Sequence, residues 1–252
     1  MSKKIAVITG AGRGLGRSMA LHLARAGTDI VGTYRENKAE AEAAAVEIER
    51  AGAKAIMLRL DVSDKRQIDA FAARLPDVLD ETFGRRTFDF LINNAGIGLN
   101  RPFQETTEEQ FDALFAINVK APFFLTQALL PAIADGGSIV NLSSGLARFS
   151  LPGNSAYGAT KGAIEVLTRY MAREFGDRKI TANVVAPGAI ETDFGGGVVR
   201  DNPEVNARVT SQIPLGRVGQ PDDVGAAVAA LLVNAGHWIN GTRIEVSGGQ
   251  NL

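Results

Sequence analysis

In the stretch "KIAVITGAGRGLG", residues 4–16, a short apolar run leads directly into closely spaced glycines and a helix-like segment, which is typical of a strand followed by a tight turn and a helix. The common G-x-G-x-x-G dinucleotide fingerprint does not fit this stretch, since Leu15 and Arg17 stand where that pattern needs glycine. The stretch is therefore a different kind of cofactor loop, a broken one, or only a glycine-rich turn.

Gly10, Gly14 and Gly16 follow the spacing G-x-x-x-G-x-G, with one more residue in the turn than the common fingerprint. The physical demands on the loop are unchanged. A first glycine permits the tight turn off the strand, and a later one lets backbone N–H groups approach a pyrophosphate at the helix N-terminus. Taken alone, the loop favours cofactor binding no more than a structural turn, so the rest of the chain has to decide.

Short β-branched runs alternate with longer segments of helical period. Several runs are apolar on both faces, as parallel strands covered by helices must be. The alternation predicts an α/β fold, a Rossmann-type doubly wound parallel sheet of about seven strands, in a single domain over residues 1–252 rather than two small ones. We expect strands at 4–9, 29–34, 54–59, 88–92, 137–142, 179–186 and 243–247, and helices at about 14–27, 37–50, 64–82, 107–134, 155–176 and 221–233.

The longest stretch without strong periodicity is 188–214, which follows the carboxyl end of a predicted strand. Ligands bind at that end of such sheets, and three consecutive glycines at 195–197 give the backbone freedom. We interpret the segment as a mobile substrate lid within the domain; a plain long loop is the alternative.

The composition excludes several classes of function. Lys and Arg total 27 against 28 for Asp and Glu, which gives no electrostatic reason to expect nucleic acid or an acidic membrane surface. The absence of cysteine and the separation of the two histidines predict neither thiol chemistry nor a metal site. The apolar run at 5–9 is short for a signal peptide, and the run at 224–233 is about half of a membrane span. We expect a cytoplasmic protein.

Further motifs follow in order along nearly the whole chain: "LDV" at 60–62, "NNAG" at 93–96, "NLSS" at 141–144, "YGATK" at 157–161, "PG" at 187–188 and "VSGG" at 246–249. Together with the loop "TGAGRGLG" they resemble the short-chain dehydrogenase/reductase family. Ser247 departs from the family pattern, in which an acidic or amide residue is more common. Any one motif could arise by chance, but six in the expected order make the resemblance specific.

The resemblance implies a nicotinamide dinucleotide cofactor. The segment at 60–62 resembles the part of the family that contacts adenine. The implied cofactor-binding residues are Gly10, Arg13, Gly14, Leu15, Gly16, Tyr34, Arg35, Asp61, Val62, Asn94, Ala95, Gly96, Tyr157, Lys161, Pro187, Gly188 and Thr192.

The residues at the end of the second predicted strand favour NADP(H) over NAD(H). NAD-dependent enzymes usually place a carboxylate there, near the adenosine ribose. By alignment, Tyr34 takes that position and Arg35 follows it, while Arg13 adds a second cation within the glycine loop. Two guanidinium groups suit a 2′-phosphate. Glu36 would favour NAD instead if the loop path brought it to the ribose.

Tyr157 and Lys161 lie four apart in a predicted helix, so their side chains share one face. A nearby ammonium favours the phenolate, so we expect Lys161 to lower the tyrosine pKa. The resemblance makes Tyr157 the proton donor, Lys161 a ligand of the nicotinamide ribose and Ser144 the hydroxyl that binds the substrate carbonyl, with Ser143 structural. It also makes Asn118 the holder of a water behind the lysine. Taken singly, each residue has a structural alternative. Tyr157 could be a buried aromatic and Lys161 a solvated helix charge, while Ser144 could cap a helix or turn and Asn118 could be an outward-facing polar residue.

The resemblance implies NADPH-dependent reduction of a ketone to a secondary alcohol, or the reverse oxidation. A 3-oxoacyl thioester reductase and a non-catalytic NADP-binding regulator are the alternatives, and the complete catalytic set argues against the regulator. A third alternative is an extended sugar-nucleotide epimerase. It is disfavoured, because that branch has another glycine spacing and a larger C-terminal substrate region, and this chain shows neither. The expected pocket, at 96–103, 145–154 and 188–214, combines Leu99, Phe103, Leu146, Phe149 and Leu151 with the charge of Arg148, and its apolar side chains suggest an uncharged or apolar carbonyl compound.

The helices expected at 107–134 and 155–176 carry more apolar residues than one sheet-facing stripe needs. The family usually pairs these helices between subunits, and its C-terminal strand and tail form a second contact. We therefore expect a homotetramer. The alternative is that both are wide-faced core helices of a dimer or monomer.

Overall fold

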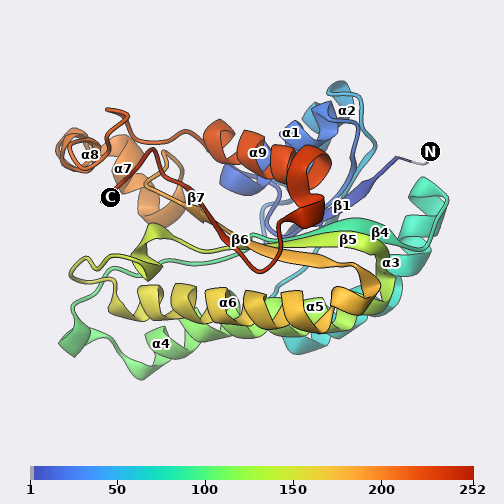
Figure 1. The fold of residues 1–252 in the computed structure, drawn as a ribbon, viewed down its shortest axis with the longest axis horizontal. Coiled ribbons are helices and arrows are strands. Elements are labelled where there is room, and N and C mark those ends of the chain that lie inside the picture. The colour runs from blue at the N-terminus through green and yellow to red at the C-terminus, as the bar shows by residue number, and fades with distance from the viewer. Residues whose placement is uncertain (1–2) are drawn as a thin grey trace.

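The computed structural model describes residues 3–252, and within them seven parallel strands form one sheet in the order β3-β2-β1-β4-β5-β6-β7 (Figure 1). This confirms the predicted fold class. The strands are β1 (Ile5–Ile8), β2 (Asp29–Tyr34), β3 (Ala55–Arg59), β4 (Phe88–Asn93), β5 (Ile133–Leu142), β6 (Thr181–Pro187) and β7 (Arg243–Val246). The helices are α1 (Gly14–Arg25), α2 (Lys38–Arg50), α3 (Lys65–Phe83), α4 (Glu108–Phe115), α5 (Ala121–Leu129), α6 (Ser155–Glu174), α7 (Val198–Asp201), α8 (Pro203–Thr210) and α9 (Pro221–Ala230).

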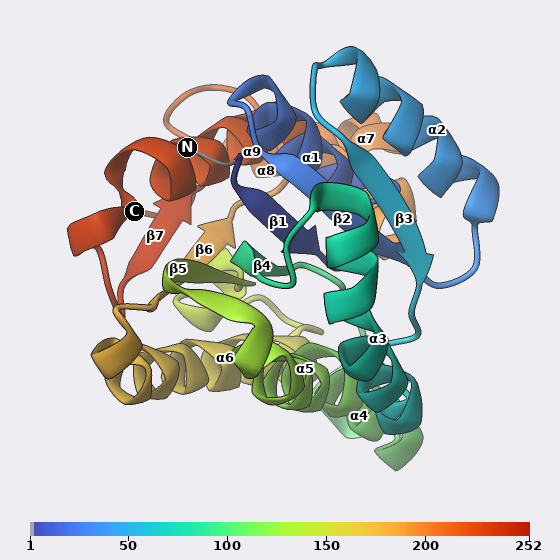
Figure 2. The ribbon, with the colours of Figure 1, turned by 90° about the vertical axis from the view of Figure 1, so that its right-hand side faces the viewer.

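Helices cover both faces of the sheet: α1, α2 and α9 lie on one side, and α3, α4, α5 and α6 lie on the other (Figures 1 and 2). Strand β1 shows why its residues are all apolar. Ile5 and Val7 belong to the core under α3, α5 and α6, while Ala6 and Ile8 belong to the core under α1 and α9. Successive side chains of a strand point to opposite faces, so a strand covered on both sides has no polar face.

The long helix predicted at 107–134 is divided into several pieces. α4 and α5 are joined by a π-helical turn, Ala116–Lys120, and α5 ends in a 3₁₀ turn, Leu130–Ala132. β5 then begins at Ile133, four residues before the predicted start, and Ile133 pairs with Phe88 of β4. Pro131 explains the difference, because it cannot continue the helical hydrogen bonding.

By length and composition alone, the helical segment Glu108–Ala132 could reach across a membrane, since its most apolar window of 18 residues has a mean hydropathy of 1.5. In the fold it packs beside α3 and α6 instead, and Leu125 and Leu129 of its second half are fully buried. Only 39% of its most apolar window is buried, however, so apolar side chains remain at the surface.

The segment 188–214 contains regular structure that the sequence interpretation missed. α7 and α8 lie there, at the end of the sheet opposite the N-terminus (Figure 1). Asn202 caps α8, because its side-chain oxygen accepts hydrogen bonds from the backbone N–H groups of Glu204 and Val205 at 3.0 and 3.1 Å. Pro203 occupies the first helical position, where a missing N–H costs little.

Candidate active site

The centre of the sheet provides the expected ligand crevice. β1 pairs with β2 on one side and with β4 on the other, so the sheet grows outward from β1 through β2 and β3 in one direction and through β4 to β7 in the other. In sheets of this kind, ligands bind outside the carboxyl ends of the strands at that switch point. The glycine loop follows β1 and the "NNAG" motif ends β4, which places both at this crevice.

The glycine loop has a backbone that other residues would strain. Gly10 and Gly14 adopt positive φ angles of 67° and 54°. A Cβ atom at Gly16 would lie 2.1 Å from the carbonyl oxygen of Gly10, so that position has no room for a side chain. Within residues 3–252, no side chain caps the N-terminus of α1 and no acidic residue lies in its first turn. Its free N–H groups therefore fit a pyrophosphate.

Asn94 fixes the glycine loop to the end of β4. Its side-chain amide donates to the carbonyl oxygens of Thr9 and Gly10 at 2.8 and 3.1 Å. The Thr9 hydroxyl accepts in return from the backbone N–H groups of Asn94 and Ala95 at 3.0 and 2.9 Å. These four bonds hold the loop in place before any ligand binds. The side chain of Asn94 thus holds the glycine loop in position.

The opposite wall of the crevice is made by the end of β6 and the residues after it. The Gly188 N–H donates to the Val246 carbonyl at 3.0 Å, and a Cβ atom on Gly188 would lie 2.9 Å from Ser247. The Thr192 methyl group comes within 3.8 Å of where a Gly14 side chain would begin. Pro187, Gly188 and Thr192 therefore line the crevice across from the glycine loop.

The residues expected to read the ribose lie at the loop's outer end, beside β2. The Ala11 N–H donates to the Thr33 carbonyl at 2.9 Å, which brings the loop against the end of β2. Arg13 pairs with Asp193 at 3.3 Å, and Arg35 pairs with Glu36 at 2.9 Å. All four side chains are about half exposed or more, so these ion pairs are weak and can exchange for a phosphate.

The residues expected to contact adenine follow β3. One Asp61 oxygen accepts from the N–H and the hydroxyl of Ser63 at 2.9 and 2.7 Å. Tyr34 ends β2, and its carbonyl accepts from the Leu60 N–H at 2.8 Å. The bonds within the turn orient the Asp61 carboxylate. Val62, beside Asp61, packs on the core under α3 and α5.

Tyr157 and Lys161 lie on the inner face of α6 and are buried, with 8% and 6% of their surface exposed. The Lys161 ammonium donates to the Leu142 carbonyl at 2.9 Å and lies 5.5 Å from the centre of the Tyr157 ring. The interpretation of Lys161 as a solvated helix charge is therefore wrong. Lysine is rarely buried to this degree unless its ammonium is paired, so the position of Lys161 favours a functional role.

The expected lowering of the Tyr157 pKa is not what this environment produces. Burial raises the pKa of Tyr157 to about 12, although the Ser144 hydroxyl beside it acts in the opposite direction. Burial also lowers the pKa of Lys161 to about 8. Desolvation disfavours both charged forms, and here its effect exceeds the attraction that the sequence argument relied on.

Asn118 is buried at the π-helical turn between α4 and α5 and does not face outward. Its amide donates to the Ile97 carbonyl at 2.9 Å and to the Thr160 hydroxyl at 3.2 Å, and its oxygen accepts from the Ile97 N–H at 3.0 Å. A Cβ atom on Gly96 would lie 3.1 Å from the Asn118 oxygen and 3.8 Å from the Lys161 ammonium. Gly96 thus leaves open a space that both the asparagine and the lysine border.

The two serines at the end of β5 have different surroundings. The Ser144 oxygen accepts from the Leu146 N–H at 3.2 Å, so it caps a short turn and also lies beside Tyr157. Ser143 is buried, and its hydroxyl donates to Glu165 at 2.7 Å. Ser143 is therefore engaged with Glu165, and Ser144 is the serine that lies beside Tyr157; its role toward a substrate stays a prediction.

Tyr157 belongs to a small apolar cluster. Leu114 and Ala156 are buried with it, and the partly buried Ile97, Leu99 and Leu146 pack against this cluster. From the segment after β6, the Phe194 ring comes within 5.9 Å of the Tyr157 ring, centre to centre.

Gly98 explains the approach of Phe194, because a Cβ atom there would lie 2.8 Å from its ring. Phe194 was not singled out in the sequence, since a lone aromatic in an aperiodic segment gives no signal. Asp193, the partner of Arg13, was missed for the same reason.

Arg148 is not a charge of the pocket. Its guanidinium donates to both carboxylate oxygens of Glu245 at 3.1 Å and to the carbonyls of Gln250 and Asn251 at 2.8 and 3.0 Å. These bonds direct the side chain to the C-terminal segment. The Arg148 charge, which the sequence placed in the substrate pocket, is therefore engaged with the C-terminal segment.

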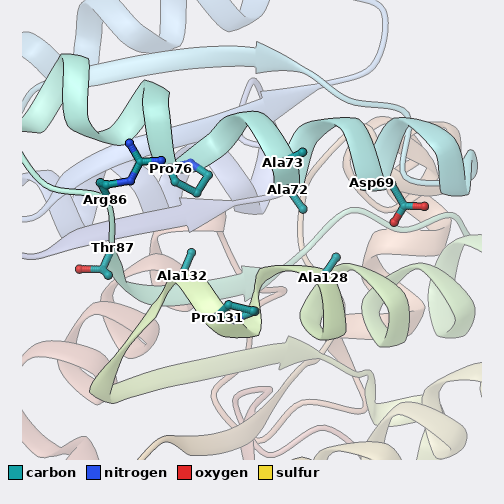
Figure 3. A pocket seen from close by; sticks show the side chains of 9 residues that line it. All are labelled: Asp69, Ala72, Ala73, Pro76, Arg86, Thr87, Ala128, Pro131 and Ala132. Atoms are coloured by element: carbon teal, nitrogen blue, oxygen red, sulfur yellow. The ribbon is translucent and has the colours of Figure 1, made fainter.

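A surface pocket of about 590 Å³ lies elsewhere, between α3 and α5 (Figure 3). Arg86 and Thr87 in its wall directly precede β4, so the pocket is at the amino end of the strands. The cofactor loop and Tyr157 are at the carboxyl end. This pocket is therefore separate from the candidate active site.

Comparison with known proteins gives matches over nearly the whole chain. A family model described as enoyl-(acyl carrier protein) reductase matches residues 10–251. The hydroxynaphthalene reductase-like protein Arp2 of Metarhizium brunneum is 34% identical over 260 residues, which cover 99% of this chain and 95% of that protein. A short-chain dehydrogenase/reductase of Pestalotiopsis microspora is 37% identical over 256 residues, or 98% and 94% of the two chains.

Solved structures agree with these relatives. The angucycline C-6 ketoreductase LanV with bound NADP has a TM-score of 0.93 and 36% identity, over 98% of this chain and 95% of that one. The reductase LugOII, described as catalysing keto-reduction at C1 during lugdunomycin biosynthesis, has a TM-score of 0.93 and 38% identity, over 98% and 97%.

Proposed function

The chain belongs to the short-chain dehydrogenase/reductase family, and from that premise we propose that it reduces the ketone of a polycyclic aromatic compound with NADPH. The placement of Ser144, Tyr157 and Lys161 beside a preformed glycine loop carries the proposal. When bound, the nicotinamide would supply the hydride.

In this proposal the Ser144 hydroxyl donates to the substrate carbonyl oxygen and holds it near Tyr157. The Tyr157 phenol gives its proton to that oxygen as the alcohol forms. The raised pKa keeps the phenol protonated at neutral pH, which suits the reductive direction. Lys161 holds the nicotinamide ribose, and Asn118 supports the path that returns a proton to the site.

The substrate class rests on two kinds of support. The partly buried Ile97, Leu99 and Leu146 beside Tyr157 offer uncharged surface to a planar compound, and the half-exposed Phe194 ring offers a flat one. The related proteins point the same way: one is named a hydroxynaphthalene reductase-like protein, and LanV was solved with rabelomycin. These names describe those proteins, and their chemistry is proposed here for this chain.

A substrate panel tests the proposal. Polycyclic aromatic ketones, small aliphatic ketones, 3-oxoacyl thioesters and sugars would each be assayed by the loss of NADPH absorbance. We expect the aromatic ketones to give the highest kcat/KM. Fastest turnover of 3-oxoacyl thioesters would contradict the substrate class, and NADPH binding without turnover of any compound would support a regulator.

The choice of NADP(H) follows from Arg13 and Arg35. The double variant Arg13→Ala/Arg35→Ala should weaken NADPH binding about tenfold or more, because a charge-assisted bond contributes roughly 1.5–3 kcal/mol and 1.4 kcal/mol is tenfold. NADH binding should change little, since NADH lacks the 2′-phosphate. Fluorescence titration of both cofactors measures this.

A matched control removes two other surface arginines, Arg66 and Arg86, which are 92% and 59% exposed. Their alanine variants should bind both cofactors as the wild type does. If the Arg13/Arg35 variant lost affinity for NADPH and NADH equally, the arginines would not be reading the phosphate.

We also infer a homotetramer. Apolar side chains remain exposed on the helices that the family pairs between subunits, namely Phe111 of α4, Phe123 of α5, and Val166 and Tyr170 of α6. Two different self-complementary contacts, one through these helices and one through β7 and the C-terminal tail, generate closed two-fold symmetry.

Light scattering at micromolar concentration should give about four times the mass of the 26.6 kDa chain. A mass of one chain would refute the association, and twice that mass would remove one of the two contacts.

A further inference from the structure

A cluster of four charged side chains, Arg148, Glu165, Arg243 and Glu245, lies behind the catalytic serine. We refer to it as the Arg243 cluster. The Arg243 guanidinium makes three different contacts: Nε donates to Glu165 at 2.7 Å, Nη1 donates to Glu245, and Nη2 donates to the carbonyl oxygen of Ser144 at 3.1 Å. One side chain of β7 thus reaches the backbone of the residue expected to bind the substrate.

Glu165 connects the cluster to the catalytic helix. It lies four residues after Lys161 and eight after Tyr157, so the three side chains share one face of α6. The carboxylate oxygen that accepts from Arg243 also accepts from the Ser143 hydroxyl at 2.7 Å, and that hydroxyl lies 3.3 Å from the Lys161 carbonyl. Both serines at the end of β5 are therefore tied to α6 and β7.

The cluster is better shielded than the surface ion pairs of this chain. Arg243, Glu165 and Glu245 are 21%, 17% and 24% exposed, whereas Arg217 and Asp223 are 54% and 36% exposed. Partly buried pairs are screened less by salt, and an arginine that donates in three directions loses most of its freedom. The cluster is a rigid support for the backbone it contacts.

We propose that Arg243 is a positioning residue, which acts through Glu165 and the Ser144 carbonyl to hold the Ser144 hydroxyl in line with Tyr157. This inference rests on the proposed reductase function. Small displacements of a catalytic group have large effects on rate, because a misplacement of about 1 Å can cost about 10²-fold. A purely structural ion pair would contribute to stability and leave turnover unchanged.

Arg243→Gln tests the proposal in the full-length enzyme. We expect kcat for ketone reduction to fall about 10- to 100-fold, with the affinity for NADPH close to that of the wild type. The slowed step should be the chemical one, so single-turnover rates should fall in parallel with kcat. Arg243→Lys should recover part of the loss, because the ammonium keeps the charge beside Glu165 but lacks the planar fork.

Arg178 provides a matched control. It also pairs with a carboxylate, Asp135, at 2.8 Å and donates to two backbone carbonyls, those of Leu130 and Ile133, but at the opposite end of β5. Arg178→Gln should lower the melting temperature at least as much as Arg243→Gln and leave kcat of the folded enzyme unchanged. Equal losses of kcat in the two variants would overturn the proposal.

Glu165→Gln serves where Arg243→Gln fails to fold, since it keeps the volume and an acceptor for Ser143. It should lower kcat, and the double variant with Arg243→Lys should lose less than the product of the two single losses, as expected for residues that act together. An active wild type whose variants keep full kcat overturns this inference alone. A wild type that reduces no ketone overturns the proposed function and this inference with it.

Discussion

Replacing Tyr157 with phenylalanine is expected to lower turnover about 10²–10⁴-fold, the usual contribution of a positioned acid. The ring packs among Leu114, Leu99 and Leu146 and is 8% exposed, so phenylalanine keeps the packing and removes only the hydroxyl. NADPH binding should therefore stay close to that of the wild type. Steady-state kinetics with the best ketone of the panel and a fluorescence titration of NADPH measure the two effects.

Tyr170→Phe is the control for this variant. Tyr170 lies on the same helix, and 62% of its surface is exposed. The loss of the Tyr170 hydroxyl should leave kcat unchanged. A lower kcat in Tyr170→Phe would instead reveal a general effect of altering α6. If Tyr157→Phe retained more than about a tenth of the wild-type rate, the phenol would not be the proton donor.

The fold class could be predicted because it follows from local pattern, whereas the interpretation of the glycine loop as a cofactor loop also needed the other motifs along the chain. The apolar residues Ile5–Ile8 need cover on both faces, and together with the alternation of strands and helices this requirement indicates a parallel sheet between helix layers. Gly16 has a strict steric reason, since a side chain there would meet the Gly10 carbonyl. Requirements of this kind concern single residues or short runs, so a sequence can reveal them without the structure.

The relations between distant segments could not be predicted in the same way. The Phe194–Tyr157 contact joins residues from two segments of the chain and depends on the missing side chain of Gly98. The Arg243–Ser144 bond spans 99 residues. Single-sequence patterns gave the type of the strands and of the long amphipathic helices, and they carry no information on which side chains meet at the ends of those elements.

The pKa of Tyr157 shows why the spacing of Tyr157 and Lys161 in the sequence was insufficient to predict the protonation behaviour of the site. The four-residue spacing of Tyr157 and Lys161 correctly placed both on one face. The direction of the pKa shift depends on burial, which raises the tyrosine value and lowers the lysine value. Burial is set by the whole fold around α6, including the π-helical turn that brings Asn118 and Thr160 together.

Replacing Lys161 with methionine is expected to lower ketone reduction by about 10² or more, comparable with the loss of a positioned catalytic group. Methionine fills similar space, and it removes the ammonium that donates to Leu142. Without that charge the nicotinamide ribose loses its proposed partner, so NADPH affinity should fall as well. This separates the variant from Tyr157→Phe, which should retain NADPH.

The pH dependence of kcat/KM in the wild type should also report the charge state of Lys161. Lysine is charged below its pKa, and burial places the pKa of Lys161 at about 8. The reductive kcat/KM should therefore be level below pH 7, fall as the pH rises through about 8, and lose that descending limb in Lys161→Met. Tyr157, with a pKa raised to about 12, stays protonated across this range and contributes no limb there. A rate that rises through pH 8 would show that the neutral amine is the active form, and the charged lysine would then have no role in the reaction.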